Sequence, residues 1–218
     1  MTGATGFLGS HLLETLIERG HRVIILKRSF SNTWRINHIL TAHGSQITSH
    51  DIDLVSVEEA FKQHPPDMVI HLATCYRKFH SQEDVEELMR SNIEFPSHVV
   101  ELCRKYGVKY FINTGTLFEH DLVHSQVSEK DPLRPYNLYA ATKIAFENIL
   151  KFYVLEYGIK AVTLKLFAPY GYRENETKLI PFLIKSVLEG KDVSISKGKQ
   201  RWDFTYCKDI VRAYINSM

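Results

Sequence analysis

Short apolar runs alternate along the first 168 residues with stretches whose apolar positions recur every three or four residues. The apolar runs are rich in β-branched residues and predict buried strands over 22–26, 67–74, 108–116 and 160–167. The periodic stretches predict amphipathic helices over 9–20, 57–64, 96–107 and 138–158. Glycines stand where three of these helices should end, at Gly20, Gly107 and Gly158. This order of elements predicts an α/β fold with an open, doubly wound parallel sheet.

The alternation changes after residue 168. A polar, loop-like stretch is followed by a helix pattern over 179–190 and by a pattern of strands and turns over 192–206. We therefore expect one domain over 1–168, and over 169–218 part of a small C-terminal lobe with a segment that returns to the first domain. Only Met1 and Thr2 precede the first glycine, so we expect the printed chain to begin inside its first strand.

Composition narrows the class of protein. The chain has 218 residues, of which 44% are hydrophobic and 24% charged, as in ordinary globular domains. The formal net charge of +2 gives no reason to expect nucleic acid or a membrane surface as a partner. The three cysteines, Cys75, Cys103 and Cys207, form no CxxC motif and predict reduced thiols in a cytoplasmic protein. No apolar run reaches membrane-spanning length.

The stretch "TGATGFLGSH" carries three glycines three residues apart, directly before a predicted helix. Gly3 would allow a tight turn from strand to helix, Gly6 a close approach to a pyrophosphate, and Gly9 close packing of the helix. The helix N-terminus would then present free N–H groups to the anion. The pattern predicts a Rossmann-type dinucleotide site, and a purely structural turn is the alternative.

Tyr139 and Lys143 are four residues apart and share one face of the predicted helix 138–158. A nearby ammonium and an oxidised nicotinamide would favour the phenolate and lower the tyrosine pKa. Tyr139 could then exchange a proton with a carbinol oxygen while a hydride moves at the carbon. Thr116 ends the predicted strand 108–116 and could hydrogen-bond the reacting oxygen. Alternatively, Thr114 and Thr116 cap a turn.

Together these motifs resemble the extended short-chain dehydrogenase/reductases, the nucleotide-sugar epimerase/dehydratase group. The matching segments are "TGATGFLGSH", "HDIDL" (50–54), "HLAT" (71–74), 91–116, "PLRPYNLYAATK" (132–143), "LKLFAPYGYR" (164–173) and parts of 179–213, in the family's order. The resemblance implies a catalytic triad of Thr116, Tyr139 and Lys143. It also implies that relatives continue beyond the position of Met218.

The resemblance further implies a set of binding residues. For the cofactor these are Gly3, Thr5, Gly6, Phe7, Leu8, Gly9, Asp51, Ile52, Leu72, Ala73, Thr74, Asn92, Thr114, Phe167 and the pair Tyr139 and Lys143. For a nucleotide-sugar they are Thr116, Leu179, Phe182 and Arg201, beside Trp202. Arg77 follows a strand end on the ligand side and could meet a substrate phosphate, although an exposed loop explains it equally. The chain departs from the family at Ala168, where asparagine is frequent.

Lys27 and Arg28 directly follow the expected strand 22–26, where an acidic residue would hydrogen-bond the ribose hydroxyls of NAD. Basic residues there suit a 2′-phosphate, because arginine binds phosphate through paired N–H donors. With Ser29 and Ser31 nearby, the stretch favours NADP, and NAD is the alternative. A solvated loop is the structural explanation.

Cofactor choice bears on the reaction. Reductases of the group consume NADPH, whereas its epimerases and dehydratases recycle their nicotinamide, so we expect reduction of a keto-sugar nucleotide. Thr116 is followed by Leu117 and Phe118 rather than by the acid/base pair that dehydration requires. The alternatives are an NAD-dependent nucleotide-sugar 4-epimerase and a dinucleotide-binding protein or fragment without catalysis.

Two weaker signals remain. His120 and His124 are spaced as metal ligands can be, but no third ligand is evident, so we expect no metal. Ile144, Ile149 and Phe152 on the helix 138–158 could form a homodimer seam, as the family often pairs there, or could be core residues.

Overall fold

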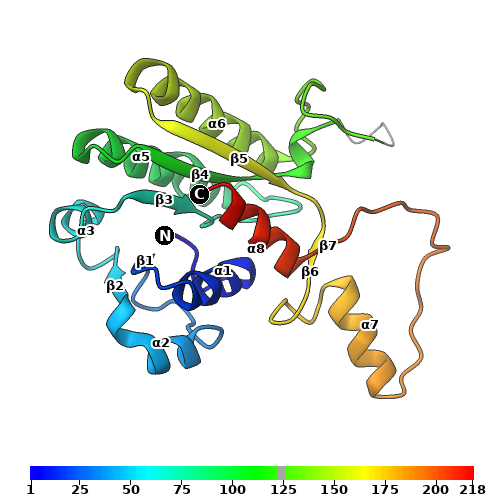
Figure 1. The fold of residues 1–218 in the computed structure, drawn as a ribbon. Helices are drawn as coiled ribbons and strands as arrows, with labels where there is room; N and C mark the ends of the chain where they lie inside the picture. Colours follow the sequence, from blue (N-terminus) through cyan, green and yellow to red (C-terminus); the bar gives the residue numbers. More distant parts are fainter. Residues whose placement is uncertain (122–125) are drawn as a thin grey trace.

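The computed structural model describes residues 1–121 and 126–218, and in this part of the chain parallel strands alternate with helices (Figure 1). The strands are β1 Val23–Lys27, β2 Ile47–Asp51, β3 Met68–His71, β4 Tyr110–Thr116, β5 Lys160–Leu166, β6 Pro169–Tyr170 and β7 Thr205–Tyr206. The helices are α1 Phe7–Glu18, α2 Asn37–His43, α3 Val57–Gln63, α4 Asp84–Met89, α5 Phe95–Tyr106, α6 Leu138–Tyr157, α7 Leu179–Leu188 and α8 Cys207–Asn216. The predicted α/β class is confirmed.

All named strand pairs are parallel. β1 pairs with β2, and β3, β4 and β5 form a three-stranded group in that order. Thr2 lies between the two groups and bridges Leu26 of β1 on one side and His71 of β3 on the other. The N-terminal residues therefore occupy the centre of the doubly wound sheet, where the order of the strands reverses. Ligands bind outside the carboxyl ends of the strands at such a point.

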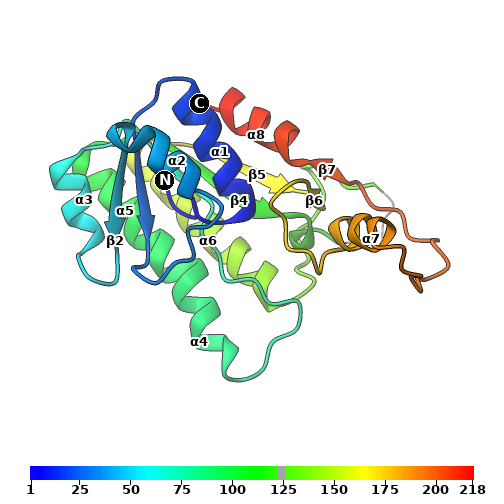
Figure 2. The same cartoon turned by 90° about the horizontal axis from the view of Figure 1, so that it is seen from below.

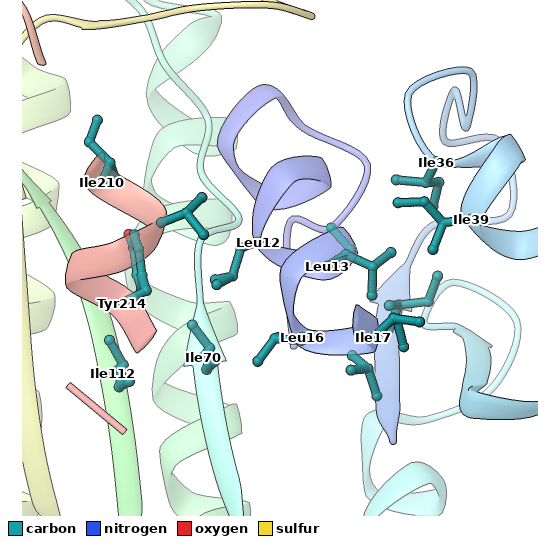
Figure 3. Close-up of a cluster of buried hydrophobic side chains, with 14 residues drawn as sticks. Leu12, Leu13, Leu16, Ile17, Ile36, Ile39, Ile70, Ile112, Ile210 and Tyr214 are labelled. Carbon is teal, nitrogen blue, oxygen red and sulfur yellow. The ribbon is translucent and has the colours of Figure 1, made fainter. Parts of the chain in front are cut away.

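Helices cover both faces of the sheet. One face carries α1, α2 and α8, whose apolar side chains meet Ile70 and Ile112 of the strands in the cluster shown in Figure 3. The other face carries α3, α5 and α6, packed on Val69 and Phe111. Because both faces are covered, the inner strands are continuous apolar runs rather than alternating ones. The sheet is a rigid platform for the loops at its carboxyl edge.

Local chemistry explains where the main helices start and stop. The Asn137 side chain accepts the Ala140 N–H at 2.9 Å and so caps the start of α6. Gly107 and Gly158 end α5 and α6 in the left-handed conformation, with φ of 72° and 68°, as their positions predict. The Asn137 cap fixes the start of α6, which carries Tyr139 and Lys143.

A π-helical stretch, Arg90–Glu94, joins α4 to α5. It turns the buried Asn92 side chain toward the loop after β3, where the Asn92 amide accepts the Cys75 N–H at 2.8 Å and donates to the Cys75 carbonyl at 2.9 Å. The predicted helix 96–107 is therefore only the second half of a longer helical segment. π-helical turns of this kind are frequent at functional sites.

The last fifty residues differ in part from the prediction. α7 and the segment before β7 extend from one end of the molecule, as both views show (Figures 1 and 2). The strands expected over 192–206 reduce to the two residues of β7, because the polar stretch 191–204 pairs with no other strand in the described chain. α8 then returns to the main body, and its Tyr214, Ile210 and Val211 join the core beside α1.

Candidate cofactor and active site

The glycine loop lies at the centre of the carboxyl edge of the sheet. Gly3 has a φ of 71°, and a β-carbon there would lie 2.7 Å from the backbone of Leu72 and Ala73. A β-carbon on Gly9 would lie 2.0 Å from the Gly3 carbonyl oxygen, so α1 can approach the loop this closely only with glycine. Gly6 is the N-cap of α1 and gives no side-chain cap to the first amides of the helix. This cradle fits a pyrophosphate at a helix N-terminus.

The loop after β3 is fixed against the glycine loop. The Thr2 hydroxyl oxygen accepts the N–H groups of Leu72 and Ala73 at 3.1 and 3.0 Å. Thr74 follows and donates its hydroxyl to the Asn92 side chain at 3.0 Å. The structure thus brings Leu72 and Ala73 beside Gly3, the arrangement expected for residues beneath a dinucleotide, and directs Thr74 toward Asn92.

The ends of β1 and β2 form the second part of the edge. Register places Lys27 opposite Asp51, and their side chains form an ion pair. The Ile52 N–H donates to the Lys27 carbonyl at 2.9 Å. The Lys27 ammonium is therefore already paired, whereas the exposed Arg28 guanidinium lies over the ring of Phe30, 4.8 Å from its centroid.

A second carboxylate near the corner formed by the ends of β1 and β2 also accepts hydrogen bonds. Asp53 accepts the Ser29 backbone N–H at 2.7 Å and the Ser29 hydroxyl at 2.6 Å. These two bonds lower the pKa of the Asp53 carboxyl. Both Asp51 and Asp53 thus have partners within the protein.

Thr116, Tyr139 and Lys143 lie where β4 ends and α6 begins, and all three are buried, at 7%, 8% and 2% exposure. The Tyr139 hydroxyl interacts with the hydroxyls of Thr74 and Thr116, which lower its pKa, but burial dominates and raises that pKa to about 12. The lowering that the sequence predicts depends on Lys143 together with a bound oxidised nicotinamide. In the protein alone the phenol is protonated at neutral pH.

Burial acts on Lys143 in the opposite sense. It lowers the pKa of the ammonium to about 8, while the charges of Glu119 and Glu147 raise it. Burial thus raises the pKa of the Tyr139 phenol and lowers the pKa of the Lys143 ammonium.

Thr114 has a structural role in addition to its predicted place in the cofactor site. Its hydroxyl donates to the His71 carbonyl at 2.7 Å and so accepts from the Tyr214 hydroxyl of α8 at 2.6 Å. Phe167 directly follows β5 and lines a cavity of about 820 Å³ with Leu166 and residues of α6 and α8.

The expected substrate residues are not gathered in the same way. Arg77 pairs with Asp84 and Glu87, each at 2.9 Å, so a phosphate would compete with two carboxylates. Leu179 and Phe182 are half exposed on α7, and Arg201 is exposed in the segment before β7. Their role in substrate binding stays a prediction.

Two neighbours of Tyr139 were missed from the sequence. The Tyr76 ring packs edge-on against the Tyr139 ring at 5.0 Å, and the Lys178 ammonium lies 5.1 Å from the Tyr76 ring centroid. Lys178 is the N-cap of α7, so it links that helix to the catalytic corner. Sequence separation hides such contacts, although Tyr76 stands next to the Arg77 that we singled out.

The described residues hold no group of three or more His, Cys, Asp or Glu side chains that could bind a metal ion. His124 of the histidine pair lies outside these residues. No helix of the described chain is long and apolar enough to cross a membrane.

A doubly wound sheet with a glycine cradle at its switch point and a buried Thr–Tyr–Lys set defines a dinucleotide-dependent enzyme of the extended short-chain dehydrogenase/reductase fold. A family model described as "NAD dependent epimerase/dehydratase family" matches residues 1–218. The chain belongs to this family. The predicted resemblance is therefore confirmed.

Individual relatives fall in several branches of the family. The chain is 30% identical to the CDP-abequose synthase of Salmonella muenchen over 216 residues, which are 99% of this chain and 68% of that protein. The UDP-glucose 4-epimerase of Thermotoga maritima, solved with UDP-glucose, has a TM-score of 0.85 at 28% identity, covering 100% of this chain and 72% of that one. The UDP-glucuronic acid 4-epimerase of Bacillus cereus, solved with NAD, has a TM-score of 0.86 at 27% identity, covering 98% of this chain and 71% of that one.

Proposed function

We propose that the protein is an NADPH-dependent reductase of a keto-sugar nucleotide. The observation that carries this proposal is the corner formed by β1 and β2, where Asp51 and Asp53 are both engaged and Arg28 is exposed. An NAD-type corner needs a free carboxylate for the ribose hydroxyls. The exposed Arg28 guanidinium, on a turn where the Ser31 hydroxyl accepts the Arg28 backbone N–H at 3.1 Å, suits a 2′-phosphate instead.

The chain's own groups divide the work at the reacting centre. The cofactor supplies hydride when bound. The Gly6 end of α1 would hold its pyrophosphate, and Lys143 its nicotinamide ribose. Thr116 would polarise the substrate carbonyl, and Tyr139 would give its proton to the developing alkoxide. Reduction begins with a protonated phenol, which a tyrosine with a pKa of about 10 or above supplies at neutral pH.

Dehydration is less well supported. The carboxylate nearest to Thr116 in sequence is Glu119, which is fully buried and bound to the Thr116 N–H and the Lys165 ammonium. A side chain held in this way is not free to exchange protons with a sugar hydroxyl. The CDP-abequose synthase relative is consistent with a non-epimerase reaction on a nucleotide-sugar.

An NAD-dependent nucleotide-sugar 4-epimerase is the second candidate. The observation that favours it is the similarity to solved 4-epimerases, one of them in complex with NAD. An epimerase returns its nicotinamide to the starting oxidation state, so it gives no net oxidation of NADPH. Stoichiometry therefore separates the two candidates.

We also propose that the protein acts in the cytoplasm and pairs through α6. Its three cysteines are free and buried, which fits a reducing compartment. Of the predicted seam residues, Ile144 and Ile149 are partly buried, Ile149 against the core, whereas Phe152 is 51% exposed. Phe152 and the neighbouring Leu155, which is 70% exposed, leave apolar surface on α6 that supports a homodimer seam.

The test follows NADPH absorbance with 4-keto sugar nucleotides and compares the wild-type protein with Tyr139→Phe. We expect one NADPH oxidised per keto-sugar consumed, and a loss of turnover of about 10²-fold or more in the variant, because it lacks the proton donor. Tyr157→Phe, an exposed tyrosine at the end of the same helix, should leave turnover unchanged. Sugar interconversion without NADPH loss would favour the epimerase, and near-normal turnover of Tyr139→Phe would refute the mechanism.

A further inference from the structure

Glu119 is a fully buried carboxylate in the turn that follows the catalytic Thr116. Its Oε1 accepts the Thr116 backbone N–H at 2.7 Å, and its Oε2 pairs with the Lys165 ammonium of β5. The Phe118 N–H donates to the Thr116 hydroxyl oxygen at 3.4 Å, which completes a capping box and leaves the hydroxyl hydrogen free to donate. Both oxygens of Glu119 are thus used to shape the turn that presents Thr116.

The backbone around this pair is adapted to it. A β-carbon on Gly115 would lie 2.9 Å from Oε1 of Glu119 and 3.1 Å from the Lys165 side chain. Only glycine therefore lets β4 pass this close to the buried ion pair. Lys165 also pairs with Glu147 of α6 at 2.9 Å, and Glu147 lies one helical turn after Lys143 on the same helix.

The titratable groups around Glu119 come from two elements, β5 and α6, and from the adjacent His120. Lys165 belongs to β5, whereas Tyr139, Lys143 and Glu147 belong to α6. His120 follows Glu119 directly and is itself buried. The negative charge of Glu119 raises the pKa of both Lys143 and Tyr139, and burial raises the pKa of Glu119 against the opposing Lys165 ammonium.

We propose that Glu119 is a positioning residue that fixes the Thr116 turn through Oε1, while its ion pair with Lys165 anchors that turn to β5. This inference rests on the proposed function, because it gives Thr116 the task of polarising the substrate carbonyl. Glu119 does not touch the reacting atoms. It acts through the backbone that presents the Thr116 hydroxyl.

Two variants test this action. Glu119→Gln keeps an oxygen for the Thr116 N–H but removes the charge, whereas Glu119→Leu removes both. NADPH and NADH binding is measured by fluorescence, together with kcat, KM and melting temperature. Glu101→Gln serves as the control, since Glu101 pairs with Arg104 on α5.

Glu119→Gln should keep kcat within a few-fold of wild type, because its amide oxygen can still accept the Thr116 N–H. Glu119→Leu should lose about tenfold or more in kcat, with little change in KM or in NADPH affinity, because the Thr116 turn is no longer held. Glu101→Gln should match the wild-type protein in all of these quantities.

Wild-type kcat in Glu119→Leu would overturn the proposal, even if the variant melts earlier. So would an equal loss of kcat in Glu119→Gln and Glu119→Leu, because the bond to the Thr116 N–H would then not be the cause. Should Glu119→Leu fail to fold, Glu119→Asp, which keeps the charge but withdraws the oxygens by one methylene, decides in its place: unchanged kcat in that variant would overturn the proposal. A wild-type protein that binds neither NADPH nor NADH would refute the proposed function itself, an outcome visible before any variant is compared.

Discussion

At the scale of single residues, the burial of the Lys143 ammonium lowers the free energy of unfolding. Its ammonium is 2% exposed, and burial lowers its pKa from 10.5 to about 8. Between these two pH values the unfolded chain binds a proton that the folded chain does not, so stability rises with pH across that window. Below pH 8 the whole cost of about 3 kcal/mol is present. In the proposed mechanism this charge serves to bind the nicotinamide ribose.

Lys143→Met should therefore abolish turnover and yet stabilise the fold. At pH 7 we expect the free energy of unfolding to rise by up to about 3 kcal/mol, since methionine fills the site without a charge. The gain should shrink above pH 8 and vanish near pH 10.5. Urea unfolding at several pH values measures it, with the exposed Lys151→Met on the same helix as control. A gain that is absent at pH 7, or equally large at pH 10.5, would contradict the assignment.

Among the elements, α8 packs on the sheet beside α1 and is connected to the strands that lead to the candidate site. Tyr214 is fully buried between α1 and the sheet, and its hydroxyl donates to Thr114 at the end of β4. Thr114 passes its own hydrogen to the His71 carbonyl of β3. The last helix of the described chain is thus joined by hydrogen bonds to both strands that carry the active site.

Tyr214→Phe should lower the free energy of unfolding by about 1 kcal/mol, because it removes one buried hydrogen bond and leaves the ring in place. Denaturant unfolding measures this change. Tyr110→Phe, at a half-exposed tyrosine of β4, should cost nothing measurable. Equal stability of Tyr214→Phe and wild type would mean that the hydroxyl pair contributes nothing.

The elements also show what the sequence can and cannot predict. The strands and helices around the glycine loop follow from local periodicity and from glycine caps such as Gly107, and were predicted within a few residues. β2 was missed because "ITSHD" is polar and half exposed, so no apolar run marks it. α2 and α4 were missed for a similar reason, since only one buried residue anchors each of them, Ile39 and Leu88.

For the candidate site, the residues that act through local motifs could be predicted, whereas those that act through distant pairing could not. The glycine loop and the Tyr139–Lys143 spacing are short-range patterns. The pairing of Lys27 with Asp51 and of Lys165 with Glu119 depends on strand register, which brings residues 24 and 46 positions apart into contact. The direction of the Tyr139 pKa likewise depends on how deeply the fold buries the ring.

On the scale of the whole molecule, contacts of α1 connect the two parts of the candidate site. The His11 ring of α1 donates to the Tyr172 carbonyl at 2.7 Å, and Glu14 of α1 pairs with Arg173 at 3.0 Å. The helix that would bind the pyrophosphate is thereby tied to the segment that leads to α7. Lys178 then extends this connection to Tyr76 and Tyr139. A series of contacts therefore connects the expected cofactor region with the helix that carries the expected substrate residues Leu179 and Phe182.

The proposed use of NADPH by this protein is tested first by fluorescence titration with NADPH and with NADH. We expect the wild-type protein to bind NADPH at least about tenfold more tightly, since each charge-assisted hydrogen bond to a phosphate contributes about 1.5–3 kcal/mol. Arg28→Ala should lose this preference by weakening NADPH binding alone, while the exposed Arg22→Ala should bind like wild type. Equal or tighter binding of NADH by the wild-type protein would contradict the account and move the NAD-dependent epimerase into first place.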